Sequence, residues 1–343
     1  MAIIGIDSHK DLLAAARLDD AGRLVEYRLI ENTIDGHCEV IDWLEVSGCV
    51  KVAIEGSGSY GRPLALTLLD AGVEVVEVPP QMTAAARKGQ RSNTKNDKVD
   101  ATLIGRIGLR DDDLPNPRPS GPIEDLRILV GYRRELVGEQ NRAINRLHSD
   151  LEQIRVGYHR QIATRIGSVK SLQHCRNLLA KDRSTAARIA RKRITSILAL
   201  GREIDAFGKE IKTTVAATGT QLLDIDGIGP IVAADILTEV GDPTRFATKA
   251  KFAMANGTTP LEASSGRRRR HRLNRGGNRQ LNKAIHIAAI TQIARPDTEG
   301  RRYFEKRLND GKTKREAIRA LKRQISDRIW TTLTTPQTTS ALT

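Results

Sequence analysis

Short apolar runs alternate with polar turns over the first 80 residues of the chain. Five of these runs predict strands: residues 2–7, 12–18, 24–30, 50–54 and 73–78. The second and third runs follow the first after short polar turns, which predicts a three-strand meander. Helices are expected between the later runs, at about residues 36–47 and 63–71. Strands interleaved with helices predict a mixed sheet that carries helices on its faces, and so an α/β domain.

A repeat of seven residues dominates the middle of the chain. One apolar row consists of Val130, Val137, Ile144 and Leu151, with Leu126, Leu147 and Ile154 at the companion positions. A second series consists of Ile197, Ile204 and Ile211, with Ile194, Leu200 and Phe207. The spacing predicts two long helices that pair as an antiparallel coiled coil or dimerise across chains. Arg133 and Gln140 interrupt the companion row, and glycines at 131, 138, 201 and 208 count against unbroken helices.

The sequence from residue 221 to residue 242 reads QLLDIDGIGPIVAADILTEVGD. An apolar lead-in, a turn at Gly227 and Gly229 and a following helical pattern resemble a helix-hairpin-helix, in which backbone amides at a helix start face a DNA phosphate. An ordinary turn between two helices is the alternative. A short helix is expected at residues 246–255, and residues 281–330 read as helical with a break at Pro296.

These patterns divide the chain into five parts. Three acids followed by Pro115, Pro117 and Pro119 stop regular structure and predict a linker. The expected parts are an α/β domain at 1–110, a linker at 111–122, a coiled-coil or oligomerisation region at 123–215, a mostly α-helical domain at 216–332 and a disordered tail at 333–343.

Composition narrows the class of partner. The 343 residues carry a net charge of +15, with a pI near 10, and Arg outnumbers Lys. This balance favours bidentate contacts to phosphate, so nucleic acid is the expected partner. Aromatic residues make up only 3% of the chain, which argues against binding that is dominated by base stacking.

Targeting and redox features are few. The chain has no apolar run long enough to cross a bilayer and no secretory signal at its start, so we expect a cytoplasmic protein without a membrane partner. The three cysteines lack paired metal-ligand spacing, which supports neither a disulfide framework nor a zinc site.

Basic side chains are concentrated between Ser264 and Lys283, where no carboxylate occurs. They are Arg267, Arg268, Arg269, Arg270, Arg272, Arg275, Arg279 and Lys283. Ser264 and Ser265 precede Gly266 at the edge of this run, so a hydroxyl nucleophile beside a phosphate is conceivable. By itself, the stretch is more typical of a surface turn next to a solvated or disordered basic arm. A second basic face is expected further on and contains Arg319, Lys322 and Arg323 among others.

Four carboxylates come from separate predicted elements. Asp7 and Glu55 each end an apolar strand, and Asp97 and Asp100 are three residues apart, so that they share one face of a helix. Oxygen ligands of this kind suit Mg²⁺ or Mn²⁺, which can assist phosphoryl transfer. The alternative is that these acids cap helices or lie in solvent.

Taken together, these motifs resemble the DEDD transposases of the bacterial insertion-sequence family whose elements encode a bridge RNA, a family that includes the pilin-inversion recombinase. The N-terminal resemblance is carried by GIDSHK, AIEGSGSYG and KNDKVDA. The C-terminal resemblance is carried by DIDGIGPIVAADILTEVGD, PLEASSG and RGGNRQLNKAI. It extends over nearly the whole chain.

The resemblance implies a ribonuclease H-like N-terminal domain of the Holliday-junction-resolvase type, with Mg²⁺ held by the four acids. It also implies that a serine attacks the DNA phosphodiester; this serine maps onto Ser265, with Ser264 as its nearest competitor. A bridge RNA would select donor and target DNA, and a dimer or tetramer, associated with the nucleoid, would cut both strands at two sites. Nucleic-acid contacts are expected from Gly227, Gly229, Arg267, Arg268, Arg269, Arg270, Arg272, Arg275, Asn278 and Arg279.

Two other functions fit the residues. In the first, the protein is a metal-dependent nuclease or junction resolvase that uses water, and Ser265 is structural. In the second, the protein is a nonenzymatic nucleic-acid scaffold whose acids only cap helices.

Overall fold

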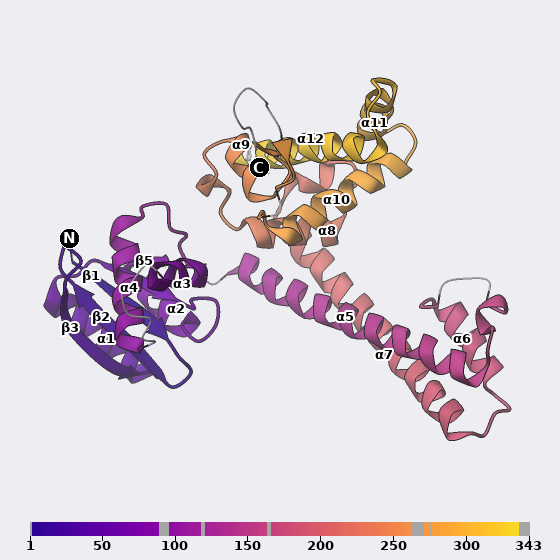
Figure 1. Ribbon diagram of the computed structural model, residues 1–343, viewed down its shortest axis with the longest axis horizontal. Coiled ribbons are helices and arrows are strands. Elements are labelled where there is room, and N and C mark those ends of the chain that lie inside the picture. Colours follow the sequence, from indigo (N-terminus) through magenta and orange to yellow (C-terminus); the bar gives the residue numbers. More distant parts are fainter. Residues whose placement is uncertain are drawn as a thin grey trace, which may run out of the picture. The chain divides into compact units, whose positions relative to one another are not determined.

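The computed structural model describes residues 2–88, 96–117, 121–162, 166–262, 271–274 and 276–335. The chain divides into two compact units, Met1–Ser120 and Gly121–Thr343. Figure 1 shows the elements of each unit. None of the helices in the described part of the chain combines the length and the apolar character needed to span a bilayer.

The first unit is built on a five-stranded mixed sheet. Its strands are β1 (Ile3–Ser8), β2 (Leu12–Leu18), β3 (Leu24–Glu31), β4 (Lys51–Glu55) and β5 (Glu74–Glu77). Their order is β3-β2-β1-β4-β5. The first three strands form the antiparallel meander, and β4 pairs parallel with both β1 and β5. This sheet confirms the α/β architecture predicted for the N-terminal part.

Helices cover both faces of this sheet. On one face, α1 (Ile34–Ser47) and α2 (Arg62–Asp70) bury side chains such as Trp43 and Leu64 against Ile4 and Ile6 of β1. On the other face, α4 (Asp97–Arg110) packs so closely on β1 that a Cβ at Gly5 would lie 2.3 Å from the carbonyl oxygen of Ala101. Only glycine fits at Gly5, and α4 is thereby held against the strand that carries Asp7.

Helix α3 (Pro80–Lys88) is absent from the sequence-based expectation. Pro79 and Pro80 directly follow the fifth apolar run and are typical of the end of a strand, but proline also fits the first turn of a helix, because the amide it lacks has no partner there. In the expected linker, Leu114 is buried against the sheet and the carbonyl of Pro115 accepts a hydrogen bond from the amide of Glu77 at 2.7 Å. Part of that segment is therefore anchored to the first unit.

Two helices of 33 residues form an arm in the second unit. They are α5 (Pro122–Ile154) and α7 (Thr185–Ala217), which pack against each other within one chain (Figure 1). The four glycines leave both helices unbroken. Gly201 has a role in the seam, because a Cβ there would lie 3.1 Å from the amide nitrogen of Gln140, which donates to the carbonyl of Ile197. The polar interruption of the seam thus lies opposite a residue without a side chain.

The remainder of the second unit is mostly helical. Its elements are η2 (Gln221–Asp224), α8 (Pro230–Val240), η3 (Pro243–Arg245), α9 (Lys249–Ala255), β6 (Leu261–Glu262), β7 (His271–Arg272), α10 (Arg279–Ala294), α11 (Glu299–Asn309) and α12 (Lys314–Thr334). The helix expected at 246–255 begins only at Lys249, because the hydroxyl of Thr248 caps it by accepting from the amide of Lys251. One core joins α8, α10 and α12 with the adjoining ends of α5 and α7.

Candidate functional site

Asp7 and Glu55 lie at neighbouring strand ends. They are direct partners in the parallel register of β1 and β4. Successive side chains of a strand alternate between faces, so two residues in register point to the same face of the sheet. The carboxylates predicted from separate apolar runs are therefore brought side by side.

Helix α4 supplies the other two predicted acids. Asp97 and Asp100 both lie in its first turn, and the side chain of Asn96 caps the helix by accepting from the amide of Lys98 at 2.9 Å. The positive end of the helix dipole stabilises carboxylates at this place. Asp100 is almost fully buried and Asp97 is exposed, so the two acids meet different surroundings on one helix.

The pKa of Asp7 is affected by the other three acids. Burial raises the pKa of the Asp7 carboxyl, and the negative charges of Glu55, Asp100 and Asp97 raise it further, while His9 acts in the opposite direction. Like charges at short range oppose ionisation. The cluster therefore carries negative charge that the protein by itself does not fully compensate.

His9 belongs to this cluster although the sequence patterns did not single it out. Its Nε2 atom lies 3.4 Å from Oδ2 of Asp7 and 3.7 Å from Oδ1 of Asp97. One donor atom from each of these three residues can be chosen so that all lie within 4.8 Å of one another. The signal in the sequence was the position of His9, two residues after Asp7 and just past the end of β1.

Two residues of α3 hold the acids in place and were also missed. The hydroxyl of Thr83 donates to Oε2 of Glu55 at 2.5 Å. The guanidinium of Arg87 donates to Oδ1 of Asp100 from Nε at 2.8 Å and from Nη2 at 2.6 Å. Because α3 was not predicted, nothing in the sequence placed these side chains near the strand ends.

The donor set fits a divalent cation. Carboxylate oxygens are ligands for Mg²⁺ and Mn²⁺, and an imidazole nitrogen is compatible with Mn²⁺. The neighbouring carboxylates that, after burial, raise the pKa of Asp7 would attract a positive charge placed among them. An acidic cluster suited to a divalent metal is therefore present in the first unit.

Arg87 supplies the only cationic guanidinium with a hydrogen bond to Asp100 in the described part of the chain. We expect Arg87→Gln to lower the free energy of unfolding of the metal-free protein by about 3 kcal/mol, because it leaves the buried Asp100 carboxylate unpaired. Mg²⁺ should restore most of this loss. Thermal unfolding with and without Mg²⁺ measures both effects.

Lys88→Gln is the matched control, because Lys88 is the exposed next residue of the same helix. It should leave the unfolding temperature and its response to Mg²⁺ unchanged. An Arg87→Gln protein that unfolds like the wild type under both conditions would show that the ion pair contributes nothing to the cluster.

A basic pocket of about 840 Å³ lies in the second unit. It is formed by the segment after α9, by β7 and the start of α10, and by α12. Five cationic side chains line it: Arg272, Arg279, Arg319, Lys322 and Arg323. No carboxylate is among its described lining residues. Such a pocket favours an anion with the charge of a phosphate group.

The cations of the basic pocket are held by polar neighbours. Burial lowers the pKa of Lys322, whose ammonium donates to Oδ1 of Asn282 at 2.6 Å. Arg323 donates to the hydroxyl of Thr259 at 2.5 Å and pairs with Asp327 at 3.2 Å. Lys322 thus points its charge at a neutral amide, so an entering phosphate would gain an uncompensated cation.

The predicted nucleophile, Ser265, lies outside the described residues, as do Ser264, Arg275 and the run Arg267–Arg270. The strands on either side of residues 263–270 are described. β6 pairs antiparallel with β7, with Leu261 opposite Arg272 and Glu262 opposite His271. Pro260, just before β6, and Arg272, at the end of β7, both line the basic pocket.

The remaining predicted contacts have different surroundings. Gly227 has φ +80°, and a Cβ there would lie 2.5 Å from the carbonyl oxygen of Ala288, so close packing on α10 explains this glycine. Gly229 is exposed, and a Cβ there would meet no atom within 4 Å; the residue that follows it at the start of α8 is Pro230, which has no amide hydrogen. Asn278 caps α10 and also donates to Glu239 at 2.8 Å. The element before the turn at Gly227 and Gly229, where a helix-hairpin-helix has its first helix, is the four-residue helix η2.

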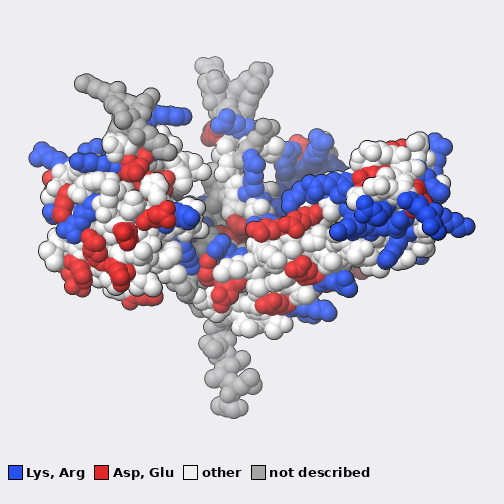
Figure 2. All heavy atoms as spheres, turned by 90° about the horizontal axis from the view of Figure 1, so that it is seen from below, with Lys and Arg blue, Asp and Glu red and all other residues white. Residues whose placement is uncertain are grey.

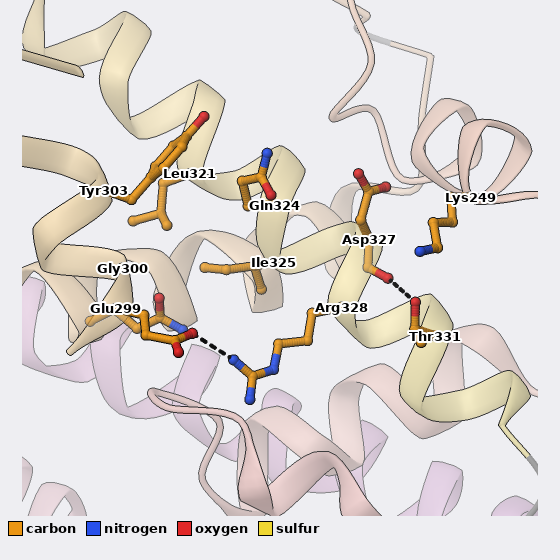
Figure 3. Close-up of a pocket in the computed structure, with 11 residues that line it drawn as sticks. Lys249, Glu299, Gly300, Tyr303, Leu321, Gln324, Ile325, Asp327, Arg328 and Thr331 are labelled. Carbon is orange, nitrogen blue, oxygen red and sulfur yellow. Dashed lines mark hydrogen bonds and ion pairs between the residues drawn. The ribbon is translucent and has the colours of Figure 1, made fainter. Parts of the chain in front are cut away.

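A second hollow lies between α9, α11 and α12 (Figure 3). It has a volume of about 460 Å³ and is lined by side chains of both charges. Glu299 and Arg328 form an ion pair across it at 3.0 Å, and Asp327 and Lys249 also line it. Its charges compensate one another, so it suits a phosphate less well than the basic pocket does.

Two protein families match the chain. A family described as a DEDD transposase of the IS110 type matches residues 4–156. A family described as "Transposase IS116/IS110/IS902 family" matches residues 219–305. The two segments include all four carboxylates, the serines, and Arg272 and Arg279 of the basic pocket.

Curated relatives match over nearly their whole length. The chain is 26% identical to the insertion element IS116 uncharacterized 44.8 kDa protein of Streptomyces clavuligerus, over 96% of this chain and 94% of that protein. It is 26% identical to the insertion element IS110 uncharacterized 43.6 kDa protein of Streptomyces coelicolor, over 94% and 91%. A solved structure titled "T. thermophilus RuvC in complex with Holliday junction substrate" is 18% identical, with a TM-score of 0.25, and matches 32% of this chain and 96% of that one.

Proposed function

The chain belongs to the IS116/IS110/IS902 family of transposases, and on that premise we propose that it cuts and rejoins the DNA of an insertion element through a covalent bond between DNA and Ser265. The observation that carries this proposal is the basic pocket. Its five cations and its lack of described carboxylates suit a DNA phosphate, and the strands that flank the serine segment begin and end at its edge.

In the proposed reaction, the hydroxyl oxygen of Ser265 attacks the phosphorus and displaces a deoxyribose hydroxyl. The P–O bond to the deoxyribose breaks and a serine–phosphate ester bond forms. The hydroxyl of Ser265 loses its proton, and the leaving deoxyribose oxygen gains one. The reverse attack by a deoxyribose hydroxyl rejoins DNA. Because a phosphate ester is present at every stage, no external energy source is needed.

The side chains of the basic pocket act on the charge of the phosphate. Arg272 and Arg279 line the basic pocket, where their guanidinium groups would bind phosphate oxygens, and Lys322 adds a partly buried ammonium. Donors that are already oriented stabilise negative charge as it develops on the phosphoryl oxygens. Their expected role is to hold the phosphate and to lower the barrier to attack.

The acidic cluster supplies the second part of the proposal. Asp7, Glu55, Asp97 and Asp100 would hold Mg²⁺, which when bound polarises a phosphate oxygen and lowers the effective pKa of an attacking hydroxyl. Arg87 and Thr83 keep Asp100 and Glu55 oriented. The imidazole of His9 lies beside two of these acids, with Nε2 at 3.4 Å from Asp7 and 3.7 Å from Asp97.

The proposal also includes partners that the family resemblance implies. A bridge RNA would select donor and target DNA, and a dimer or tetramer would supply enough subunits to cut two strands at two sites. The exposed turn at Gly229 before α8 would lie against a phosphate, as in a helix-hairpin-helix.

A metal-dependent nuclease that uses water is the second candidate. The acidic cluster favours it, because carboxylates with a bound metal suffice for phosphodiester hydrolysis without a protein nucleophile. In that case Ser265 would have no chemical role.

Transfer of a radioactive phosphate distinguishes these two reactions. A DNA substrate labelled at the scissile phosphate should leave its label on the denatured protein in the presence of Mg²⁺, and EDTA should reduce the labelled protein to background. Phosphoserine should be recovered after acid hydrolysis. Cleaved DNA without any labelled protein would instead indicate attack by water.

A further inference from the structure

The arm ends in a small folded lobe, formed by residues 141–162 and 166–200, which we call the arm tip. It includes the last turns of α5, helix α6 (Val169–Leu178) and the first half of α7. The tip has a core of its own, in which Leu147 and Leu151 of α5 pack with Leu172 of α6 and Ile194 of α7. The tip is therefore a structured lobe rather than a simple reversal of the chain.

Basic side chains cover the arm tip. Figure 2 shows Lys and Arg gathered over the end of the arm that carries α6. Ten of them are exposed: Arg142, Arg146, Arg155, Arg160, Lys170, Arg176, Lys181, Arg183, Arg188 and Lys192. None of these ten forms an ion pair within the described residues. Their charge therefore stabilises no contact of the fold.

The acids of the arm tip do not balance this charge. Only three occur: Asp150, Glu152 and Asp182. Asp150 already pairs with Arg193 at 2.8 Å, and Glu152 lies 3.9 Å from His159. Asp182 accepts from the amide of Ser184 at 2.8 Å. From Arg183 to Arg202 the chain has six basic residues and no acid.

Some of the cations lie where they oppose helix stability. Lys170 is in the first turn of α6, and Arg188 is in the first turn of α7. The helix dipole is positive at these ends, so a cation there is unfavourable. Repulsion among ten unpaired cations adds to this cost. A bound polyanion would offset both effects.

We propose that the arm tip binds the phosphate backbone of duplex DNA. Tyr158 is the only Phe, Trp or Tyr of the tip, and it is buried, so no such ring is offered to the stacked bases of a single strand. Backbone contacts by Lys and Arg suit a duplex, whose phosphates are regularly spaced. DNA is the substrate of transposases, and the inference uses that assignment without relying on Ser265.

The test compares two triple variants of the full-length protein. The tip variant carries Arg183→Gln, Arg188→Gln and Lys192→Gln. The control variant carries Arg202→Gln, Lys209→Gln and Lys212→Gln, which removes three exposed cations of α7 that lie outside the tip and form no ion pair with a described residue. The probe is a 40-base-pair DNA duplex. At about 3.4 Å per base pair it exceeds the length of α5, about 50 Å for 33 residues.

The tip variant should bind the duplex about tenfold more weakly near 0.15 M salt. Its plot of log Kd against log salt concentration should become less steep by about 2.7, since each lost phosphate contact contributes about 0.9. The control variant should change Kd less than twofold. Unchanged circular dichroism spectra would show that both variants are folded.

Equal affinities of the tip variant and the control variant would overturn the inference. An RNA duplex of the same sequence and length gives the other decisive outcome. If the tip variant loses affinity only for the RNA duplex, the DNA assignment is wrong. This assay measures binding and does not require cleavage. Its result is therefore independent of whether Ser265 is the nucleophile.

Discussion

Ser265→Ala should abolish the covalent protein–DNA species and the rejoined product. If the hydroxyl of Ser265 is the nucleophile, its removal leaves no group to form the ester, and loss of a serine nucleophile lowers rates by about 10⁴-fold or more. The expected result is no labelled protein and no recombinant DNA, while DNA binding stays within about twofold of the wild type. Denaturing gels with end-labelled and internally labelled substrates measure both products.

Ser264→Ala is the matched control, because it removes the same hydroxyl from the preceding residue. It should retain the labelled protein. If the two results are exchanged, the nucleophile is Ser264. If Ser265→Ala continues to nick DNA in the presence of Mg²⁺ at the wild-type rate, the protein uses water, and the serine proposal fails.

Asp7→Asn should lower the cleavage activity but raise the stability of the metal-free protein. We expect metal-dependent cleavage to fall by about 10²–10³-fold or more, because a ligand for the metal is lost. The metal-free protein should become more stable at neutral pH. The pKa of Asp7 is raised mainly by burial and then by the neighbouring carboxylates, so its ionisation costs folding free energy, which the neutral amide avoids.

The sign of this effect gives a pH dependence. Because the folded pKa of Asp7 lies above its unfolded value, the folded protein binds the proton more tightly. The contribution of Asp7 to the free energy of unfolding is fully present below the unfolded pKa and is lost as pH rises through the folded pKa. The stability difference between Asp7→Asn and wild type should therefore grow with pH. Denaturant unfolding in EDTA at several pH values measures it.

Asp42→Asn serves as the control, because Asp42 is exposed on α1 and lies outside the cluster. It should change neither cleavage nor the pH dependence of stability. Recombination that persists with unchanged Mg²⁺ dependence in both Asp7→Asn and Asp100→Asn would make a nonenzymatic scaffold the better description.

Most of the first unit could be predicted because its pattern is local. Each buried strand is a continuous apolar run, and the acid that ends the run lies at the carboxyl end of the strand. Asp7 and Glu55 could be paired as candidates on that basis. Their register could not be predicted, because it depends on hydrogen bonds between segments 48 residues apart.

Helix α3 could not be predicted from the local pattern. Its sequence has few buried positions and begins with prolines, so its pattern resembles a turn. Thr83 and Arg87 therefore appeared as ordinary polar residues. Only their contacts to Glu55 and Asp100 assign them to the site.

The seven-residue repeat predicted two long helices but left open whether they pair within or between chains. The structure pairs α5 with α7 inside one chain, and it places Gln140 opposite Gly201. The glycine appeared unfavourable because propensity considers one helix at a time. The contact involves both helices, so its stabilisation is not visible in either sequence segment alone.

The sequence by itself determined the elements, the charge and the residues able to perform the chemistry, since periodicity and side-chain type are properties of the chain. Tertiary structure decided which of those residues meet. It added His9 and Arg87 to the acids, and it joined Arg272 and Lys322 in one pocket. The physical reason is range: electrostatics and hydrogen bonding act over a few ångströms in space, and only folding sets which distant residues come within that range.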